Sequence, residues 1–159
     1  MSDFVLSRLA SHDCHLAYPL IREAVPGATL RNWQSYIRRT ATQRRFPMEA
    51  AIAARRRGGR YPVGLFCYRR DNDVEHGAVL TADHVIAIDI LDPHPLLQAL
   101  LQEMDSIAAE LRCSAVRSHV HHGASDITNS LIAAGHRIEG AMTFKPLLHS
   151  LRQGPAAPR

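Results

Sequence analysis

Three histidines close together in the C-terminal half are the first residues whose chemistry stands out. His119, His121 and His122 lie at the end of a short run with strand character, residues 115–121. On a strand, His119 and His121 share one face, which is the arrangement that two ligands of a divalent metal need. However, the chain holds ten histidines, so composition alone can produce such a cluster. We therefore predict strand-end histidines and no bound metal.

Asp89 is the second candidate for chemistry, because it lies in an otherwise apolar run. Residues 84–91, HVIAIDIL, are β-branched or apolar at nearly every position. A carboxylate that faces a cleft from such a strand could act as a general base toward an amine. The alternative is a carboxylate that is hydrogen-bonded at the end of the sheet or exposed to solvent. Asp89 and His119 are thus the candidate catalytic residues.

The run that contains Asp89 leads directly into a helical pattern. A β-branched stretch that is apolar on both faces is typical of a central strand covered on both sides. Asp92-Pro93-His94-Pro95 ends it, where Asp92 is a suitable N-cap and prolines are tolerated in a first helical turn. Residues 93–111 then carry leucine, methionine and isoleucine at helical spacing. We predict a central strand at 85–91 and a helix at 93–111 that packs on one face of its sheet.

The other patterns predict further strands and helices around this unit. Candidate strands are residues 4–9, 49–57, 61–70, 115–121 and 137–148, and candidate helices lie near 13–24, 29–41 and 125–134. Strands come first as a meander and then alternate with helices. The sequence therefore predicts an α/β (α+β) protein with a mixed, mostly antiparallel central sheet and helices on both faces. We expect one domain over residues 1–150 and a flexible tail over 151–159.

Composition limits the class of protein. Hydrophobic residues make up 46% and charged residues 21% of the 159 positions, as in soluble globular proteins. The three cysteines have no paired spacing, which indicates reduced thiols. The N-terminal residues do not resemble a secretory signal, and no apolar run reaches the length of a membrane span. We expect a cytoplasmic protein without a membrane partner.

Arginine supplies nearly all of the positive charge. The formal net charge is +4 and Lys145 is the only lysine. The arginines gather at residues 38–45 and 55–60. Such clusters can hold phosphates or nucleic acid, but no aromatic side chains are interleaved with them to stack on bases. We interpret them as a solvated basic face and expect no nucleic-acid partner.

The order of elements and the sequence of residues 131–147, LIAAGHRIEGAMTFKPL, resemble the GNAT superfamily of N-acetyltransferases. The resemblance extends from Phe4 to about Leu148. It implies acetyl-coenzyme A or another acyl-coenzyme A as cofactor and a small-molecule or protein amine as acceptor. In that superfamily the backbone of the fourth strand binds the pantetheine arm. By resemblance, the cofactor-binding residues here are Ile88, Ile90 and Leu91.

Two features of the chain differ from that superfamily. Its usual diphosphate-binding loop contains glycine, whereas Asp92-Pro93-His94-Pro95 has two prolines that lack N–H donors, no glycine, and a carboxylate. The second difference is a missing tyrosine. In that superfamily a tyrosine often protonates the coenzyme A thiolate, and the corresponding position here, near Leu131, holds none. We therefore expect a divergent member, with two functions left open. It is either an acyl-coenzyme A-dependent N-acyltransferase or a catalytically inactive binding or regulatory protein, and its oligomeric state, a dimer included, is also open.

Overall fold

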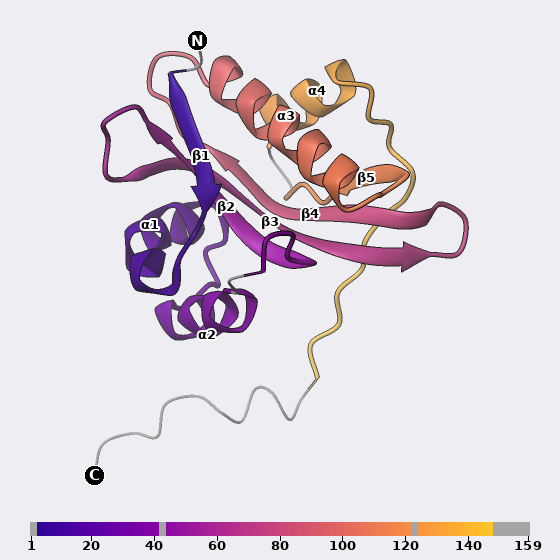
Figure 1. Cartoon of the computed structure of the whole chain (residues 1–159), viewed down its shortest axis with the longest axis horizontal. Helices are drawn as coiled ribbons and strands as arrows, with labels where there is room; N and C mark the ends of the chain where they lie inside the picture. The colour runs from indigo at the N-terminus through magenta and orange to yellow at the C-terminus, as the bar shows by residue number, and fades with distance from the viewer. Residues whose placement is uncertain (1–2, 42–43, 122–123, 148–159) are drawn as a thin grey trace.

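A mixed sheet with helices on both faces organises the protein (Figure 1). The computed structural model describes residues 3–41, 44–121 and 124–147. In these residues the strands are β1 (Phe4–Arg8), β2 (Glu49–Arg56), β3 (Pro62–Asp73), β4 (Gly77–Ala87) and β5 (Ala115–Ser118). The helices are α1 (Cys14–Ala24), α2 (Leu30–Thr40), α3 (His94–Glu110) and α4 (Ser125–Ala133), and a 3-10 turn at Ser11–Asp13 precedes α1.

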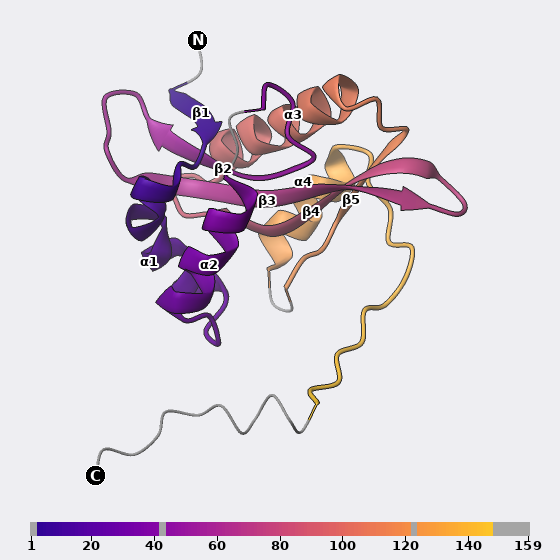
Figure 2. The same ribbon diagram turned by 60° about the horizontal axis from the view of Figure 1, so that its bottom comes forward.

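The strands neighbour one another in chain order, from β1 to β5. The first four pair antiparallel, and β4 pairs parallel with β5. The connection between β4 and β5 is α3, as a parallel pair requires a crossover. The predicted fold class, a mixed and mostly antiparallel sheet with helices on both faces, is confirmed (Figure 2).

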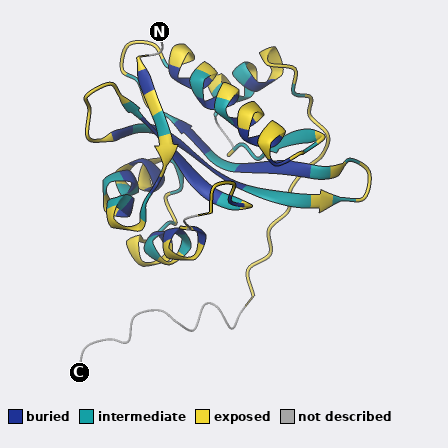
Figure 3. Ribbon diagram, in the orientation of Figure 1, coloured by how far each residue is buried: buried dark blue, intermediate teal, exposed yellow. Residues whose placement is uncertain are grey.

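Two apolar cores lie on opposite faces of the sheet. Helices α1 and α2 cover one face, where Trp33 and Ile37 pack against Leu65 of β3. Helices α3 and α4 cover the other face of these strands, where Leu100 and Met104 pack. Figure 3 shows the buried residues concentrated along β2, β3 and β4, between these two layers. The predicted helix over residues 93–111 is confirmed as α3, with its apolar stripe on the sheet.

Gly64 in β3 allows α3 to approach the sheet closely. A Cβ atom at this position would lie 3.0 Å from the carbonyl oxygen of Ile86 and 3.2 and 3.3 Å from the Cδ1 atoms of Leu96 and Leu100. Only glycine therefore fits between β4 and the first turns of α3 without displacing them. This contact fixes the position of the helix start relative to the sheet.

The predicted central strand at 85–91 is shifted in the structure. Strand β4 ends at Ala87, and β3, the middle strand of the five, is the most central one. Strand β4 ends there because its partner, β3, begins at Pro62. The last hydrogen bond between the two strands runs from the Ile88 N–H to the carbonyl of Val63. The Ile90 side chain beyond this point is 97% exposed.

The closing strand predicted at 137–148 is absent from the described residues, which end at 147. Gly135, with φ of 97°, turns the chain after α4. The following residues find no strand to pair with, although their sequence alternates like a strand. The tail predicted at 151–159 also lies outside the described residues. Within the described part, no helix combines the length and the apolar content that a membrane span needs.

Replacing Leu100 by alanine tests the packing of α3. The Leu100 side chain is fully buried between α3 and the sheet, so Leu100→Ala should lower the free energy of unfolding by about 2–5 kcal/mol. Gln98→Ala, at an exposed position of the same helix, should change it by less than ~0.5 kcal/mol. Chemical denaturation measures both, and equal effects of the two changes would contradict the placement of the helix.

Replacing Gly64 by alanine tests the close approach of α3. The added methyl group would push against a backbone carbonyl and two leucine side chains, so Gly64→Ala should destabilise the protein by about 1–3 kcal/mol. A Cβ at Gly27 meets nothing within 4 Å, so Gly27→Ala serves as the control. Thermal unfolding should show a clear fall in Tm for the first variant alone; a neutral Gly64→Ala would mean that the helix lies farther from β3.

Candidate functional site

The strands β4 and β5 part after a short parallel pairing, and this fork is the candidate site. Residues Val79–Ala82 pair with Ala115–Ser118, and the last bond runs from the His119 N–H to the carbonyl of Ala82 at 2.9 Å. At the same point β4 shifts its register against β3, and His84 takes a positive φ of 54°. A bulge of this kind turns a strand and redirects its side chains. Asp83 and His119 therefore face each other where the two strands separate.

His119 and Asp83 form a hydrogen-bonded dyad at the fork. The His119 Nδ1 lies 2.5 Å from Asp83 Oδ1, and both side chains are about a quarter to a third exposed. A carboxylate at Nδ1 favours the tautomer with its proton on that nitrogen, which leaves Nε2 as an acceptor. His119 was a candidate catalytic residue from the sequence, and in this arrangement it can accept a proton from a reacting group.

Neighbouring charges fix the orientation of Asp83. Its second oxygen receives a hydrogen bond from Nη1 of Arg69. The Arg69 Nε also lies 3.1 Å from an oxygen of Asp71, which accepts a further bond of 2.7 Å from the Thr81 hydroxyl. Because both oxygens of Asp83 have partners, its carboxylate has little freedom to rotate, and the imidazole of His119 is held with it.

A second pair of histidines flanks the dyad. The Nδ1 of His84 and the Nε2 of His121 are 3.2 Å apart and their rings stack. Burial lowers the pKa of His84 below its ordinary value, so this ring is neutral at pH 7. The described residues contain no group of three or more side chains placed to hold a metal ion. His122, the third member of the predicted cluster, lies outside them, and the absence of a bound metal remains a prediction.

Tyr36 and Cys67 lie behind the fork, on the side of α1 and α2. Their hydroxyl and thiol groups share a hydrogen bond. Burial raises the pKa of the Cys67 thiol to about 12 and that of the Tyr36 hydroxyl still higher. Both groups therefore keep their protons at neutral pH, and Cys67 is packed in the core, 1% exposed, without the thiolate that a nucleophile needs.

Asp89, the other candidate catalytic residue, lies in the loop after β4 and not at the fork. Its side chain is 6% exposed and lies 2.5 Å from Nη2 of Arg56, and it accepts a hydrogen bond from the Leu91 N–H. These partners give it a role in holding the loop to the turn end of the β2–β3 hairpin. A function as a general base remains a prediction for Asp89, and the structure does not bring it together with His119.

The first turn of α3 offers few free N–H donors. The N–H of His94 is bonded to Asp92 Oδ1 at 3.0 Å, while Pro93 and Pro95 have none. The N–H of Leu97 is already bonded to the carbonyl of Pro93. The His94 backbone N–H, together with its imidazole, holds the pKa of Asp92 below its ordinary value, so this position is negatively charged. An anion at this helix start would find a carboxylate where it needs donors.

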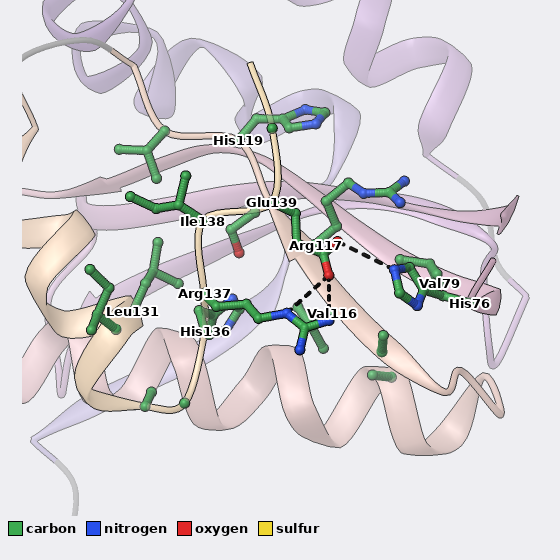
Figure 4. A pocket seen from close by; sticks show the side chains of 18 of the residues that line it. His76, Val79, Val116, Arg117, His119, Leu131, His136, Arg137, Ile138 and Glu139 are labelled. Carbon is green, nitrogen blue, oxygen red and sulfur yellow. Dashed lines mark hydrogen bonds and ion pairs between the residues drawn. The ribbon is translucent and has the colours of Figure 1, made fainter. Parts of the chain in front are cut away.

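A groove runs along the side of β5 and reaches His119 (Figure 4). It has a volume of about 1280 Å³ between β5, α3, α4 and residues 136–142. Its walls include Val116 and Leu131, and its roof is held by Glu139, which lies 3.3 Å from Nε2 of His76. The position expected for the superfamily's tyrosine, Leu131, is therefore an apolar core residue, 3% exposed.

The partner of His119 could not be recognised from the sequence. Asp83 lies two residues into a segment, TADHV, that carries no alternation and no motif. Its pairing with His119 depends on a strand bulge and on a contact between residues 36 positions apart. The one available signal was that His84 breaks the apolar pattern of the strand.

Comparison with known proteins gives a consistent picture of the fold. No protein-family model and no curated protein sequence matches the chain. Among solved structures, a ribosomal-protein-alanine N-acetyltransferase from Brucella melitensis is 15% identical, with a TM-score of 0.71 over 91% of this chain and 99% of that one. The aminoglycoside N-acetyltransferase AAC(6')-Iy in complex with coenzyme A is 12% identical, with a TM-score of 0.70 over 93% and 97%.

A third solved structure carries a different kind of name. A transcriptional regulator from Bacillus halodurans is 12% identical and superposes with a TM-score of 0.74 over 89% of this chain and 99% of that one. At such identities the likeness concerns the fold and leaves the activity open. The chain thus has the fold of the GNAT superfamily of acetyltransferases.

Proposed function

We propose that the protein is an N-acyltransferase that moves an acyl group from a coenzyme A thioester to a small-molecule or protein amine. The dyad of His119 and Asp83 at the fork of β4 and β5 is the observation that carries the proposal. It combines a proton acceptor, an orienting carboxylate and partial exposure to solvent. Structural neighbours include acetyltransferases, one of them solved with coenzyme A.

The reaction needs one proton acceptor near the attacking amine. The amine nitrogen attacks the thioester carbonyl carbon, a C–N bond forms, and the C–S bond breaks to release the thiolate. The nitrogen loses one proton, which His119 Nε2 accepts while Asp83 stabilises the resulting imidazolium. This proton then passes to the thiolate or to solvent, so that an amide and a free thiol are the products.

The acyl donor would lie along β4 beyond the fork. Among the described residues, Ile86 and Ala87 pair with β3 alone, because β5 has already ended. By the resemblance stated above, this is the strand whose backbone binds pantetheine. Of the three residues first predicted to do so, Ile88 adjoins this stretch, while Ile90 and Leu91 lie in the loop beyond it. We therefore extend the proposed backbone contacts toward Ile86 and Ala87.

A binding or regulatory function without transfer is the second candidate. The blocked start of α3 and the apolar Leu131 favour it, because each removes a group that the superfamily ordinarily uses. One of the structural neighbours is named a transcriptional regulator. Under this alternative the fork would bind a ligand, with or without a thioester, and release it unchanged.

Substitution of His119 tests the transfer reaction. His119→Gln should lower kcat by about 10²- to 10⁴-fold in an assay of thiol release from acetyl-coenzyme A with a panel of amines. Binding of acetyl-coenzyme A should stay unchanged, because the imidazole acts on the amine. His121→Gln is the matched control, since His121 pairs with His84 and not with Asp83. A wild-type protein that binds the thioester but transfers to no amine would support the second candidate instead.

The start of α3 yields a prediction about cofactor affinity. We expect weak binding of acetyl-coenzyme A, because a diphosphate there lacks about two charged N–H···O bonds. Asp92→Gly combined with Pro95→Ala frees one donor and restores another, which should raise the affinity about 10²- to 10⁴-fold in calorimetric titration. Asp92→Asn keeps an acceptor for His94 and should gain less. Micromolar binding by the unmodified protein would contradict this account of the helix start.

A further inference from the structure

The acyl donor proposed above has to leave the fork along the edge of β4 that β5 leaves open. This stretch, from Asp83 to Ala87, is roughly 13 Å long. A pantetheine arm is a chain of two amides with about the length of four extended residues. When its thioester lies at His119, its phosphate end therefore emerges after Ala87, in the loop that precedes α3.

The start of α3 offers little to the diphosphate of a nucleotide donor. The N–H of His94 is bonded to Asp92, and the two prolines beside it have none. A carboxylate at a helix start also opposes an anion there. Coenzyme A thus loses the binding energy of its phosphates at this position, whereas the thioester and the two amides of the arm keep theirs. The site therefore selects the arm and gains little from the nucleotide.

The loop at this exit exposes apolar side chains. Ile88 is 42%, Ile90 97% and Leu91 90% exposed, and Tyr61, on the β2–β3 turn, is 65% exposed. The Ile88 N–H is bonded to the carbonyl of Val63 at 2.8 Å, which joins the loop to that hairpin. The loop and the turn lie at the end of the sheet where α3 begins (Figure 1). Four large exposed apolar side chains in one place are of the kind that marks an interaction surface.

Arginines border this apolar surface. Residues 55–61, RRRGGRY, hold four arginines and no acidic residue. Arg56 is ion-paired with Asp89 and so ties the turn to the loop, while Arg57 and Arg60 are exposed beside it. The positive charge of this end is thus on the turn, and the negative charge is at the helix start. A partner with an acidic surface and some apolar contacts would complement the turn.

Pantetheine thioesters come in two forms that differ beyond the arm. In coenzyme A the arm ends in a diphosphate and a nucleotide. In an acyl carrier protein it ends in one phosphodiester on a serine of an acidic protein. The first form needs N–H donors at the helix start, and those are blocked. The second needs a basic and partly apolar docking surface at the exit of the arm, which the turn and the loop provide.

We propose that the preferred acyl donor is an acidic carrier protein with an acylated phosphopantetheine arm, docked on the β2–β3 turn and the loop 88–92. This inference rests on the proposed acyl transfer and names its donor class. The amine nitrogen attacks the thioester carbonyl carbon, the C–S bond breaks, and the carrier leaves with its thiol. The proton that the nitrogen loses passes through His119 to the thiolate.

Three donors with the same acetyl group test the donor class. They are a purified bacterial acyl carrier protein with an acetylated arm, acetyl-coenzyme A and acetyl-pantetheine. With a common amine, kcat/KM for the carrier should exceed that for both small donors at least ~10-fold. Added salt should lower the value for the carrier alone, because it screens the docking charges. A carrier no better than acetyl-coenzyme A, with both turned over, would overturn the inference and leave acyl transfer intact.

Substitutions on the turn test the docking surface. Arg60→Glu and Tyr61→Asp should each lower kcat/KM for the carrier about tenfold or more, and the value for acetyl-pantetheine should stay at that of the wild type. Arg31→Glu on α2 and Val74→Asp at the other end of β3 are the matched controls, because both side chains are exposed away from this surface. Equal losses for all three donors would overturn docking at the turn.

Direct binding of the carrier is a readout that needs no turnover. If no donor is turned over with any amine, the proposed function fails, and calorimetric titration with the acetylated carrier decides the docking surface. Binding that Arg60→Glu weakens at least ~10-fold, and that Arg31→Glu leaves unchanged, would support the surface without the transfer. No binding of the carrier would reject both.

Discussion

The short pairing between β4 and β5 is the constraint on which the rest of the structure depends. The two strands share four paired positions before the bulge at Asp83 and His84 turns β4 away. In the register of this pairing Asp83 stands opposite His119, so the two titratable side chains are neighbours on one face of the sheet. Because the strands part there, the backbone edge of β4 is released beside them. The proposed chemistry needs both features.

The start of α3 determines where binding energy for an acyl donor can arise. Gly64 lets the helix approach the sheet closely, so its first turn lies near the end of β4. That turn is closed to anions by Asp92 and by two prolines. A thioester would therefore gain its affinity along the strand, through amide hydrogen bonds and apolar contact, and little of it from its phosphates. The strand would thus provide what the fold shares in binding an acyl donor, and the start of α3 would provide what is particular to this chain.

Sequence patterns predicted the elements that rest on local periodicity. The apolar stripe of α3, the helix predicted near 29–41 and the strands predicted at 49–57 and 61–70 each depend on patterns within a few residues, and all are present. The strand end predicted at residue 91 was wrong because the end of β4 depends on where β3 begins. The closing strand predicted at 137–148 was wrong because an alternating pattern does not determine whether a neighbouring strand is there to pair with. Asp83 was missed because a bulge and a long-range contact, rather than a motif, bring it to His119.

A comparison of two acyl donors tests the central claim most directly. Acetyl-pantetheine contains the thioester and both amides of acetyl-coenzyme A but lacks the diphosphate and the nucleotide. If the fork performs the transfer and the start of α3 contributes little, kcat/KM for a common amine should agree between the two donors within about tenfold, or ~1.4 kcal/mol. Turnover with acetyl-coenzyme A alone would contradict the account of α3. Turnover with neither donor would contradict the fork as a site of acyl transfer.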